Sequence, residues 1–312
     1  MQEGRPPVAL TIGVFDGVHR GHQDLIHQMV DAARSRDLVP ACVTFDPDPE
    51  SLLHPEHPCA ALSTIEERQS LLREQGVDRL NIVEFTPRVA AQSAEEFIDA
   101  IRESWDLRQL WVGSDFALGH DRAGTVDVLS AIGESRGFSV TAVPLLTHEG
   151  RSISSTWIRE SLADGNVELV ATLLGRPYAI EGPVESGARR GRELGFPTAN
   201  VAPPPGRALP ADGVYFVQVH VVSGPKDNGS SPSDRGEKRY GVVNLGGRPT
   251  FDESERLLET HVLDFDGDLY GARMRVAFLH QLRGTRKFPS FEDLRLQIKK
   301  DVEEGRRLAA QR

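Results

Sequence analysis

The chain has 312 residues, of which 39% are hydrophobic and 26% charged, and its formal net charge is −10. This length suits two medium domains better than one large one, and the composition is that of a soluble globular protein. The negative charge argues against nucleic acid or a membrane surface as a partner, so any polyphosphate ligand has to be met by local basic groups.

Two cysteines, Cys42 and Cys59, are too few for a disulfide framework or a metal-ligand cluster. Cys42 lies in an apolar run and is expected to be a buried thiol. The stretch before Val8 is short and polar, without the apolar region of a signal peptide, and no apolar run approaches membrane-spanning length. These features predict a cytoplasmic enzyme and leave its oligomeric state open.

The first half alternates β-like apolar runs with segments of helical period. This alternation predicts a Rossmann-like α/β domain with a parallel sheet and right-handed crossovers. Such sheets bind ligands beyond the carboxyl ends of their strands. The expected strands are 8–15, 39–45, 80–84, 110–113 and 140–144, and the expected helices are 21–36, 64–75, 94–105 and 125–136.

A glycine-rich turn, residues 13–22, follows the first expected strand and opens the first expected helix. Its unpaired N–H groups and the helix dipole favour an anion. His19 and His22 are three residues apart on one helix face, where imidazoles can donate to a triphosphate and stabilise charge at an α-phosphate under attack. The alternative is a pair of surface or capping histidines. The phosphate-binding candidates of this turn are Gly13, Phe15, Asp16, Gly17 and Gly21.

A second candidate group lies in residues 153–159, where hydroxyls and a guanidinium suit β- and γ-phosphates. Ser155 or Ser154 is expected to be a helix N-cap, and Arg159 lies four residues after Ser155 on the same helix face. A cap without further function is the alternative. The candidates are Ser154, Ser155, Thr156 and Arg159, together with Asp115 in the turn after the fourth strand.

After a second short helix, 167–174, the pattern changes. From Tyr178 to Leu282 the helical period is absent, and six short β-like runs predict a small antiparallel barrel. Residues 223–237 are expected to form a hairpin loop, and an amphipathic helix is expected from Ser290 to Leu308. The predicted domains are 1–175 and 176–312. The expected strands are 178–184, 198–201, 213–222, 239–245, 257–265 and 273–281.

The segment 187–200 combines three glycines and three arginines, which predicts a loop whose N–H groups wrap phosphate. Thr198 and Asn200 are two apart on a strand, so both oxygens point to one face, where they can help to hold Mg²⁺. Glu259, on an alternating strand, can face the same site as a general base. The alternatives are a basic surface turn and a solvent-facing carboxylate. The remaining candidates are Gly187, Arg189, Gly191, Arg192, Gly195 and Pro197.

Together these motifs resemble the bifunctional prokaryotic riboflavin kinase/FMN adenylyltransferase family, also called FAD synthetase. The resemblance covers about residues 8 to 308. The motifs occur in the family's order: TIGVFDGVHRGH (11–22), VGSDFALG (112–119), ISSTWIR (153–159), LGRPY (174–178), GRELGFPTANV (191–201), VNLGGRPTF (243–251) and ETHVLDFDGDLYG (259–271).

The resemblance implies an N-terminal nucleotidyltransferase module in which His19 and His22 engage ATP phosphates, and a C-terminal six-stranded kinase barrel. In the barrel it implies γ-phosphoryl transfer from ATP to riboflavin, and in the first module transfer of AMP from a second ATP to FMN. The implied roles are closure over the phosphates by Ser155, Thr156 and Arg159, Mg²⁺ binding by Thr198 and Asn200, and activation of the ribityl 5′-hydroxyl by Glu259.

Two positions depart from the family pattern, both in the first module. Where the family reads F-x-P-H-P, Asp48 replaces an imidazole donor with a carboxylate that would repel ATP phosphates, and Leu118 replaces an aromatic in D-F-x-F-G. Three hypotheses follow: an enzyme that makes FMN and FAD, a riboflavin kinase with a weak or inactive adenylyltransferase module, and a non-catalytic flavin- or nucleotide-binding regulator. The intact kinase motifs weigh against the last.

Overall fold

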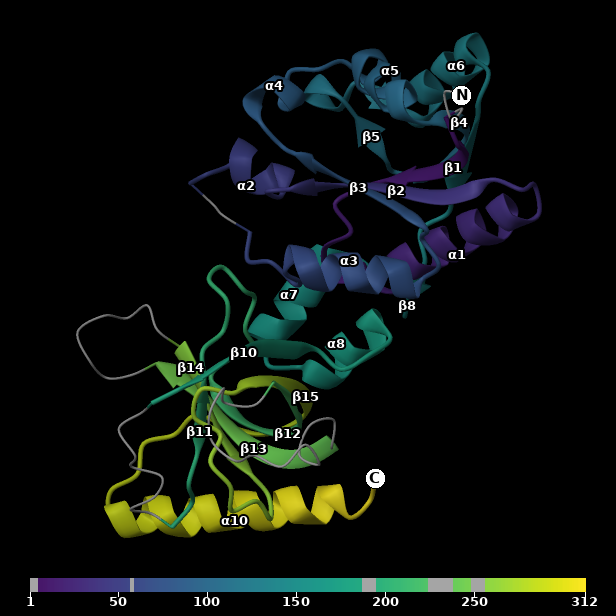
Figure 1. Cartoon of the computed structure of the whole chain (residues 1–312). Helices are drawn as coiled ribbons and strands as arrows, with labels where there is room; N and C mark the ends of the chain where they lie inside the picture. Colours follow the sequence, from purple (N-terminus) through teal and green to yellow (C-terminus); the bar gives the residue numbers. More distant parts are fainter. Residues whose placement is uncertain (1–4, 57–58, 187–194, 224–237, 248–255) are drawn as a thin grey trace. The chain divides into compact units, whose positions relative to one another are not determined.

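The computed structural model describes residues 5–56, 59–186, 195–223, 238–247 and 256–312. By its internal contacts the chain divides into two compact units, Met1–Ser155 and Thr156–Arg312. Figure 1 colours the first unit from purple to teal and the second from teal to yellow. Within the described residues, no helix is both long and apolar enough to cross a membrane.

The first unit is built on a five-stranded parallel sheet with the order β3-β2-β1-β4-β7. Figure 1 shows α1 and α3 on one side of this sheet and α5 and α6 on the other, which is the Rossmann-like arrangement that the sequence predicts. The strands are β1 (Pro7–Ile12), β2 (Val39–Asp46), β3 (Arg79–Glu84), β4 (Asp106–Gly113) and β7 (Ser139–Val143), and the helices are α1 (Arg20–Arg34), α3 (Ile65–Glu74), α5 (Ala94–Ser104) and α6 (Val126–Arg136).

Each face of the sheet has its own apolar core because successive side chains of a strand point to opposite faces. Val8, Leu10 and Ile12 of β1 pack with residues of α5 and α6, whereas Ala9 packs with residues of α1 and α3. Cys42 is fully buried in the second of these cores, as expected, and Cys59 is exposed.

The helices α3 and α5 begin at capping boxes. Thr64 and Glu67 cap α3, and Ser93 and Glu96 cap α5, each pair exchanging side-chain and backbone hydrogen bonds. Smaller elements that the sequence did not predict are α2 (Pro49–Leu53), α4 (Pro87–Ala90), the 3₁₀ turns η1 (Asp16–Val18) and η2 (His120–Arg122), and the hairpins β5 (Ala117–Leu118) with β6 (Gly124–Thr125) and β8 (Thr147–His148) with β9 (Arg151–Ser152).

The first strand is shorter than predicted. The expected strand of 8–15 ends at Ile12, because the backbone turns left-handed at Phe15, with φ 53°, and cannot continue in the sheet. The apolar side chains of Val14 and Phe15 are still buried in part or in full, since Val14 packs against the core on the α5 and α6 side and Phe15 belongs to the core on the α1 and α3 side.

The second unit is a closed antiparallel barrel of six strands with the order β10-β11-β14-β13-β12-β15, as predicted. Most of the predicted loop between β12 and β13, residues 224–237, lies outside the described residues. The elements are α7 (Ser155–Ala163), α8 (Val167–Leu174), β10 (Ala179–Glu185), β11 (Ala199–Val201), β12 (Gly213–Ser223), β13 (Lys238–Gly247), β14 (Arg256–Val262), β15 (Arg273–Gly284) and α10 (Phe291–Ala309).

The terminal helix α10 packs on the barrel through its predicted apolar side and through one buried ion pair. Gly305 lies so close to β13 that an added Cβ would come within 2.7 Å of Val242. Asp301, 6% exposed, accepts hydrogen bonds from Arg283 of β15 at 2.8 and 3.0 Å and from Gln297 at 2.6 Å.

We expect Asp301→Ala to destabilise the contact between α10 and the barrel by about 2 kcal/mol, because a charged hydrogen bond is lost and Arg283 is left without its carboxylate. Hydrogen exchange of peptides from β15 and α10, measured at increasing urea concentrations, would report the change in the free energy of this contact. Glu303→Ala is the control, since Glu303 is exposed on the same helix and faces Lys299 at 3.9 Å. Equal effects of the two substitutions would show that the buried pair does not anchor the helix.

Candidate active sites

The turn after β1 places two histidine rings face to face at the start of α1. His19 is the N-cap, and its Nδ1 accepts a hydrogen bond from the backbone N–H of His22 at 3.3 Å. The ring centroids are 3.6 Å apart with an interplanar angle of 17°. An added Cβ on Gly21 would come within 3.2 Å of the His19 ring. The glycine therefore leaves room for the stack.

The cap determines which nitrogen of His19 can act as a donor. Because Nδ1 accepts, a neutral His19 carries its proton on Nε2, which is then the ring nitrogen that can donate. Burial, the neighbouring His19 and the Arg68 guanidinium hold the pKa of His22 well below its ordinary value. At neutral pH His22 is therefore uncharged. Its Nδ1 is buried and has no hydrogen-bond partner among the described residues.

Phe15 and Gly13 shape the floor of this turn. The Phe15 ring is 2% exposed and meets His22 edge-on, with 5.1 Å between centroids. Gly13 donates its N–H to the Val43 carbonyl at 3.1 Å, and a Cβ there would come within 3.0 Å of the Phe15 ring. Of the two predicted residues, Phe15 therefore packs against His22, and Gly13 leaves room for the Phe15 ring.

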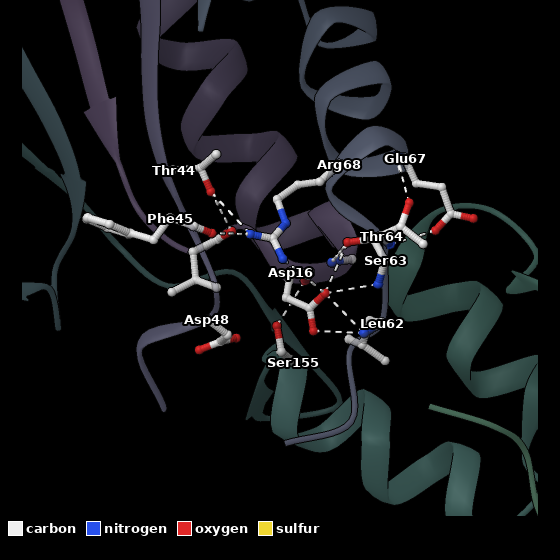
Figure 2. Close-up of polar contacts among 12 residues, drawn as sticks. Asp16, Thr44, Phe45, Asp48, Leu62, Ser63, Thr64, Glu67, Arg68 and Ser155 are labelled. Atoms are coloured by element: carbon white, nitrogen blue, oxygen red, sulfur yellow. Dashed lines mark hydrogen bonds and ion pairs between the residues drawn. The ribbon is translucent and has the colours of Figure 1, made fainter. Parts of the chain in front are cut away.

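The Asp16 carboxylate points into the protein. It is 2% exposed and accepts hydrogen bonds from Leu62 N–H, Ser63 N–H and the Ser63 hydroxyl at 2.9–3.0 Å, as Figure 2 shows. The Ser63 hydroxyl also accepts the Gly17 N–H at 3.0 Å. Asp16 thus holds the turn from behind, so we expect it to act on phosphate through the backbone.

The other candidates of the first site lie in the 153–159 motif and in the turn after β4. Ser155 donates its hydroxyl to the Asp16 carbonyl at 3.0 Å, which joins the 153–159 motif to the glycine turn. Asp115 is exposed in the turn after β4, at the same edge of the sheet. Thr156 and Arg159 belong to α7 in the second unit, so their closure over ATP phosphates stays a prediction.

The two departures from the family pattern have local structural roles. Asp48 is the N-cap of α2 and accepts the Glu50 N–H at 3.0 Å. Leu118 is 7% exposed and packs in the core next to α5. Leucine therefore fills the apolar position that the family gives to an aromatic ring.

In the barrel, strand register aligns Asn200, Glu259 and Asn244 in one row across three strands. Asn200 of β11 pairs with Glu259 of β14, which pairs with Asn244 of β13. Paired residues point to the same face, so the predicted neighbours Asn200 and Glu259 do share a face. The Asn244 amide donates to Glu259 Oε2 at 3.4 Å. Asn244 was missed although it stands in the VNLGG motif, because a single asparagine in a strand gives no signal without its register.

A cavity of about 510 Å³ opens beside this row. It is lined by Thr198, Asn200 and Thr260 and by the 265–270 segment. Asn200 is 6% exposed, and the donors gathered here are oxygens, the ligands that a hard divalent cation prefers. No cluster of three acidic, histidine or cysteine ligands occurs among the described residues.

The segment that leads into β11 is fixed by His261. Its Nδ1 lies 2.8 Å from the Pro197 carbonyl, which can only accept, so Nδ1 carries the proton. The Phe196 ring meets the same imidazole edge-on at 5.7 Å. Gly195 has φ 83°, which glycine adopts without strain. The candidates Gly187, Arg189, Gly191 and Arg192 lie outside the described residues.

The fold and the two groups of candidate residues are those expected of a two-module enzyme of phosphate transfer, with one candidate site on a parallel sheet and another on a barrel. Family models agree with this division: the model described as FAD synthetase matches residues 1–157, and the model described as riboflavin kinase matches residues 174–309. The chain belongs to the bifunctional riboflavin kinase/FMN adenylyltransferase family.

Relatives match over nearly the whole chain. The bifunctional riboflavin kinase/FMN adenylyltransferase of Pseudomonas fluorescens is 40% identical, with 96% of this chain and 92% of the relative covered. The protein of the same description from Escherichia coli K12 is 38% identical, with 96% and 91% covered. A crystal structure described as a macrolide-efflux protein from Streptococcus pneumoniae superposes with a TM-score of 0.86 at 33% identity, covering 97% of this chain and 95% of that one.

We expect His261→Ala to lower kinase kcat/KM by about tenfold or more, because a small misplacement of Thr198 and Asn200 weakens the positioning on which phosphoryl transfer depends. Initial rates of FMN formation would measure the loss. His220→Ala on β12 serves as the matched control, since His220 lies on a strand that carries none of the site residues. Unchanged activity of His261→Ala would show that the contact to Pro197 does not position the site.

Proposed function

We propose that the chain makes FMN and FAD from riboflavin and two molecules of ATP, in two separate sites. The function is carried best by one observation: the stacked, capped histidines lie in the first unit, and the Asn200–Glu259–Asn244 row lies in the second. Adenylyl transfer is assigned to residues 1–175 and kinase activity to 176–312. The proposed location is the cytoplasm, with small molecules rather than nucleic acid or membrane as partners.

In the first site, a phosphate oxygen of FMN attacks the α-phosphorus of ATP, and the bond from that phosphorus to the bridging oxygen breaks as pyrophosphate leaves. His19 and His22 donate hydrogen bonds to phosphate oxygens and stabilise the charge that develops there. The backbone N–H groups of the turn and the N-terminus of α1 bind the same anion. Ser155, Thr156 and Arg159 are assigned to closing the site over the phosphates.

In the second site, the ribityl 5′-hydroxyl of riboflavin attacks the γ-phosphorus of ATP, and ADP leaves. Glu259 accepts the hydroxyl proton, and Asn244 orients the Glu259 carboxylate through its amide. Thr198 and Asn200 would hold Mg²⁺, which supplies charge neutralisation at the phosphates when bound. The loop with Arg189 and Arg192 is assigned to phosphate binding.

Purified protein incubated with riboflavin, ATP and Mg²⁺, with flavins resolved chromatographically, tests the function. FMN and FAD together support the bifunctional enzyme. FMN alone indicates a kinase whose adenylyltransferase module is weakened by Asp48 and Leu118, and neither product indicates a binding protein without turnover.

Substitutions at the two sites should separate the activities. We expect Glu259→Ala to lower FMN formation by about a hundredfold or more, because the general base is lost, and to spare conversion of added FMN to FAD. His22→Ala should do the reverse, with a loss of about a hundredfold in FAD formation. Both half-reactions are followed separately in the same preparations. Loss of both activities in either variant would contradict two independent sites.

The carboxylate of Asp48 gives a further prediction. Asp48→His should raise kcat/KM for ATP in FAD formation by about threefold to tenfold, because it removes a repelling charge and adds a donor. Asp48→Asn keeps an oxygen to cap α2 without the charge, so a smaller gain is expected. Rates for both variants at or below wild type would show that Asp48 does not oppose ATP.

A further inference from the structure

Arg68 is a buried cation beneath the glycine turn, and no sequence motif indicates it. It belongs to α3, and its side chain is about 5% exposed. Figure 2 shows the guanidinium reaching from α3 toward two strand ends. Nη1 donates to the Phe45 carbonyl at 2.9 Å and to the Thr44 hydroxyl at 3.4 Å, and Nη2 lies 4.0 Å from Asp16 Oδ1.

These contacts connect the end of β2 to the turn after β1. Thr44, which accepts from Arg68, donates its own hydroxyl to the Val14 carbonyl at 2.9 Å. The guanidinium is therefore hydrogen-bonded to β2 directly. It is linked to the turn after β1 by its proximity to Asp16 and, indirectly, by the hydroxyl of Thr44. Both strand ends lie at the carboxyl edge of the sheet, where nucleotides bind in such folds.

The turn that is held in this way has an unfavourable backbone. Phe15, Gly17 and Val18 have φ values of 53°, 74° and 39°. Positive φ is costly for phenylalanine and more so for β-branched valine, and such residues persist only where their surroundings fix them. The hydrogen bonds of Asp16 to Leu62 and Ser63 and the nearby Arg68 are those surroundings.

Stability alone does not account for this arginine. Its Nε is buried and has no hydrogen-bond partner among the described residues, and its distance to Asp16 is longer than a hydrogen bond. A buried ion pair with incomplete hydrogen bonding is often no more stable than apolar residues of similar volume. The position next to the histidines therefore points to function.

We propose that Arg68 is a positioning residue for adenylyl transfer, whose guanidinium ties the turn after β1 to the end of β2 and fixes the backbone that carries His19 and His22. This inference rests on the proposed adenylyl transfer in the first unit. Arg68 acts through the turn, by its contacts with Asp16, Thr44 and Phe45.

The same guanidinium acts on the charge of His22. The charged or titratable groups that act on that ring are His19 at the cap and Arg68 from α3. Arg68 itself lies near Asp16 in the turn and acts on the Cys42 thiol of β2. Burial raises the pKa of Cys42, so the thiol stays neutral. Arg68 contributes to the lowered pKa of His22, after burial and His19. Removing its charge should therefore raise the pKa of His22, and the acid limb of FAD formation should move to higher pH.

Three substitutions in the full chain separate donor, charge and shape. Arg68→Gln keeps a donor for the Phe45 carbonyl but loses the charge, Arg68→Lys keeps the charge, and Arg68→Met loses both. Arg73→Met is the matched control, because Arg73 is exposed on the same helix. FMN formation in the barrel gives the active concentration of each preparation.

We expect kcat for FMN adenylylation to fall by about tenfold or more in Arg68→Gln and Arg68→Met, with KM for ATP changed less than about threefold. Arg68→Lys should retain most of the activity. In NMR titrations of the ligand-free protein, His22 should titrate at higher pH in the Gln variant than in wild type, Lys or Arg73→Met. This readout needs no turnover, so it stands even if the chain proves unable to adenylylate FMN.

The proposal is overturned if Arg68→Gln matches Arg73→Met in both kcat and His22 titration. It is also overturned if the loss consists only of a raised KM for ATP, since Arg68 would then bind phosphate directly. If Arg68→Met fails to fold, the Gln and Lys variants decide: equal kcat and equal His22 titration in those two would exclude a role for the charge.

Discussion

A left-handed turn behind the first strand is the constraint on which the first unit depends. The chain leaves β1 at Ile12, passes through positive φ at Phe15, Gly17 and Val18, and enters α1 with His19 as its cap. Such a path brings backbone N–H groups and two imidazoles to one point, and it persists because buried partners hold it. The core on either face of β1 is ordinary by comparison. What distinguishes this sheet from any other parallel sheet is the set of polar contacts under the turn.

The two sites solve the problem of binding polyphosphate to an acidic chain in different ways. In the first, His22 is uncharged at neutral pH, and the positive charge of Arg68 lies beneath the surface. In the barrel, oxygen ligands of Thr198 and Asn200 line a cavity that suits a divalent cation, and Glu259 is paired with Asn200 on the neighbouring strand. In both sites the proposed positive charge is local, from Arg68 in the first and from the loop with Arg189 and Arg192 in the second, which fits a chain with a net charge of −10.

The period of the apolar residues and the turn residues were enough to predict the parallel sheet, the six-stranded barrel and the terminal helix. A strand buried on both faces has a continuous apolar run, and a strand or helix buried on one face has a periodic one, so both kinds of burial can be recognised in the sequence. The motif histidines were singled out by their spacing. Glu259 was a candidate for the same site as Asn200, but spacing alone also allowed a solvent-facing carboxylate, and the pairing of the two residues comes from the strand register. Arg68 and Asn244 were not singled out, because a lone arginine on an amphipathic helix and a lone asparagine in a strand acquire meaning only from register and burial. The end of the first strand was misplaced because apolar side chains continue into a turn that has already left the sheet.

The row of Asn200, Glu259 and Asn244 ties chemistry to the order in which the barrel is assembled. Its members come from strands that are adjacent in the barrel, β11, β14 and β13, and a slip of one residue in β14 would turn Glu259 to the opposite face. The barrel closes only when β10 pairs with β15, as in Ala179 with Ala277. The first barrel strand in the sequence therefore has no partner on that side until the last strand has been synthesised. During synthesis the sheet can fold while the barrel is still incomplete. A nascent chain would therefore acquire its histidine site before its kinase site, in the reverse order to the two reactions.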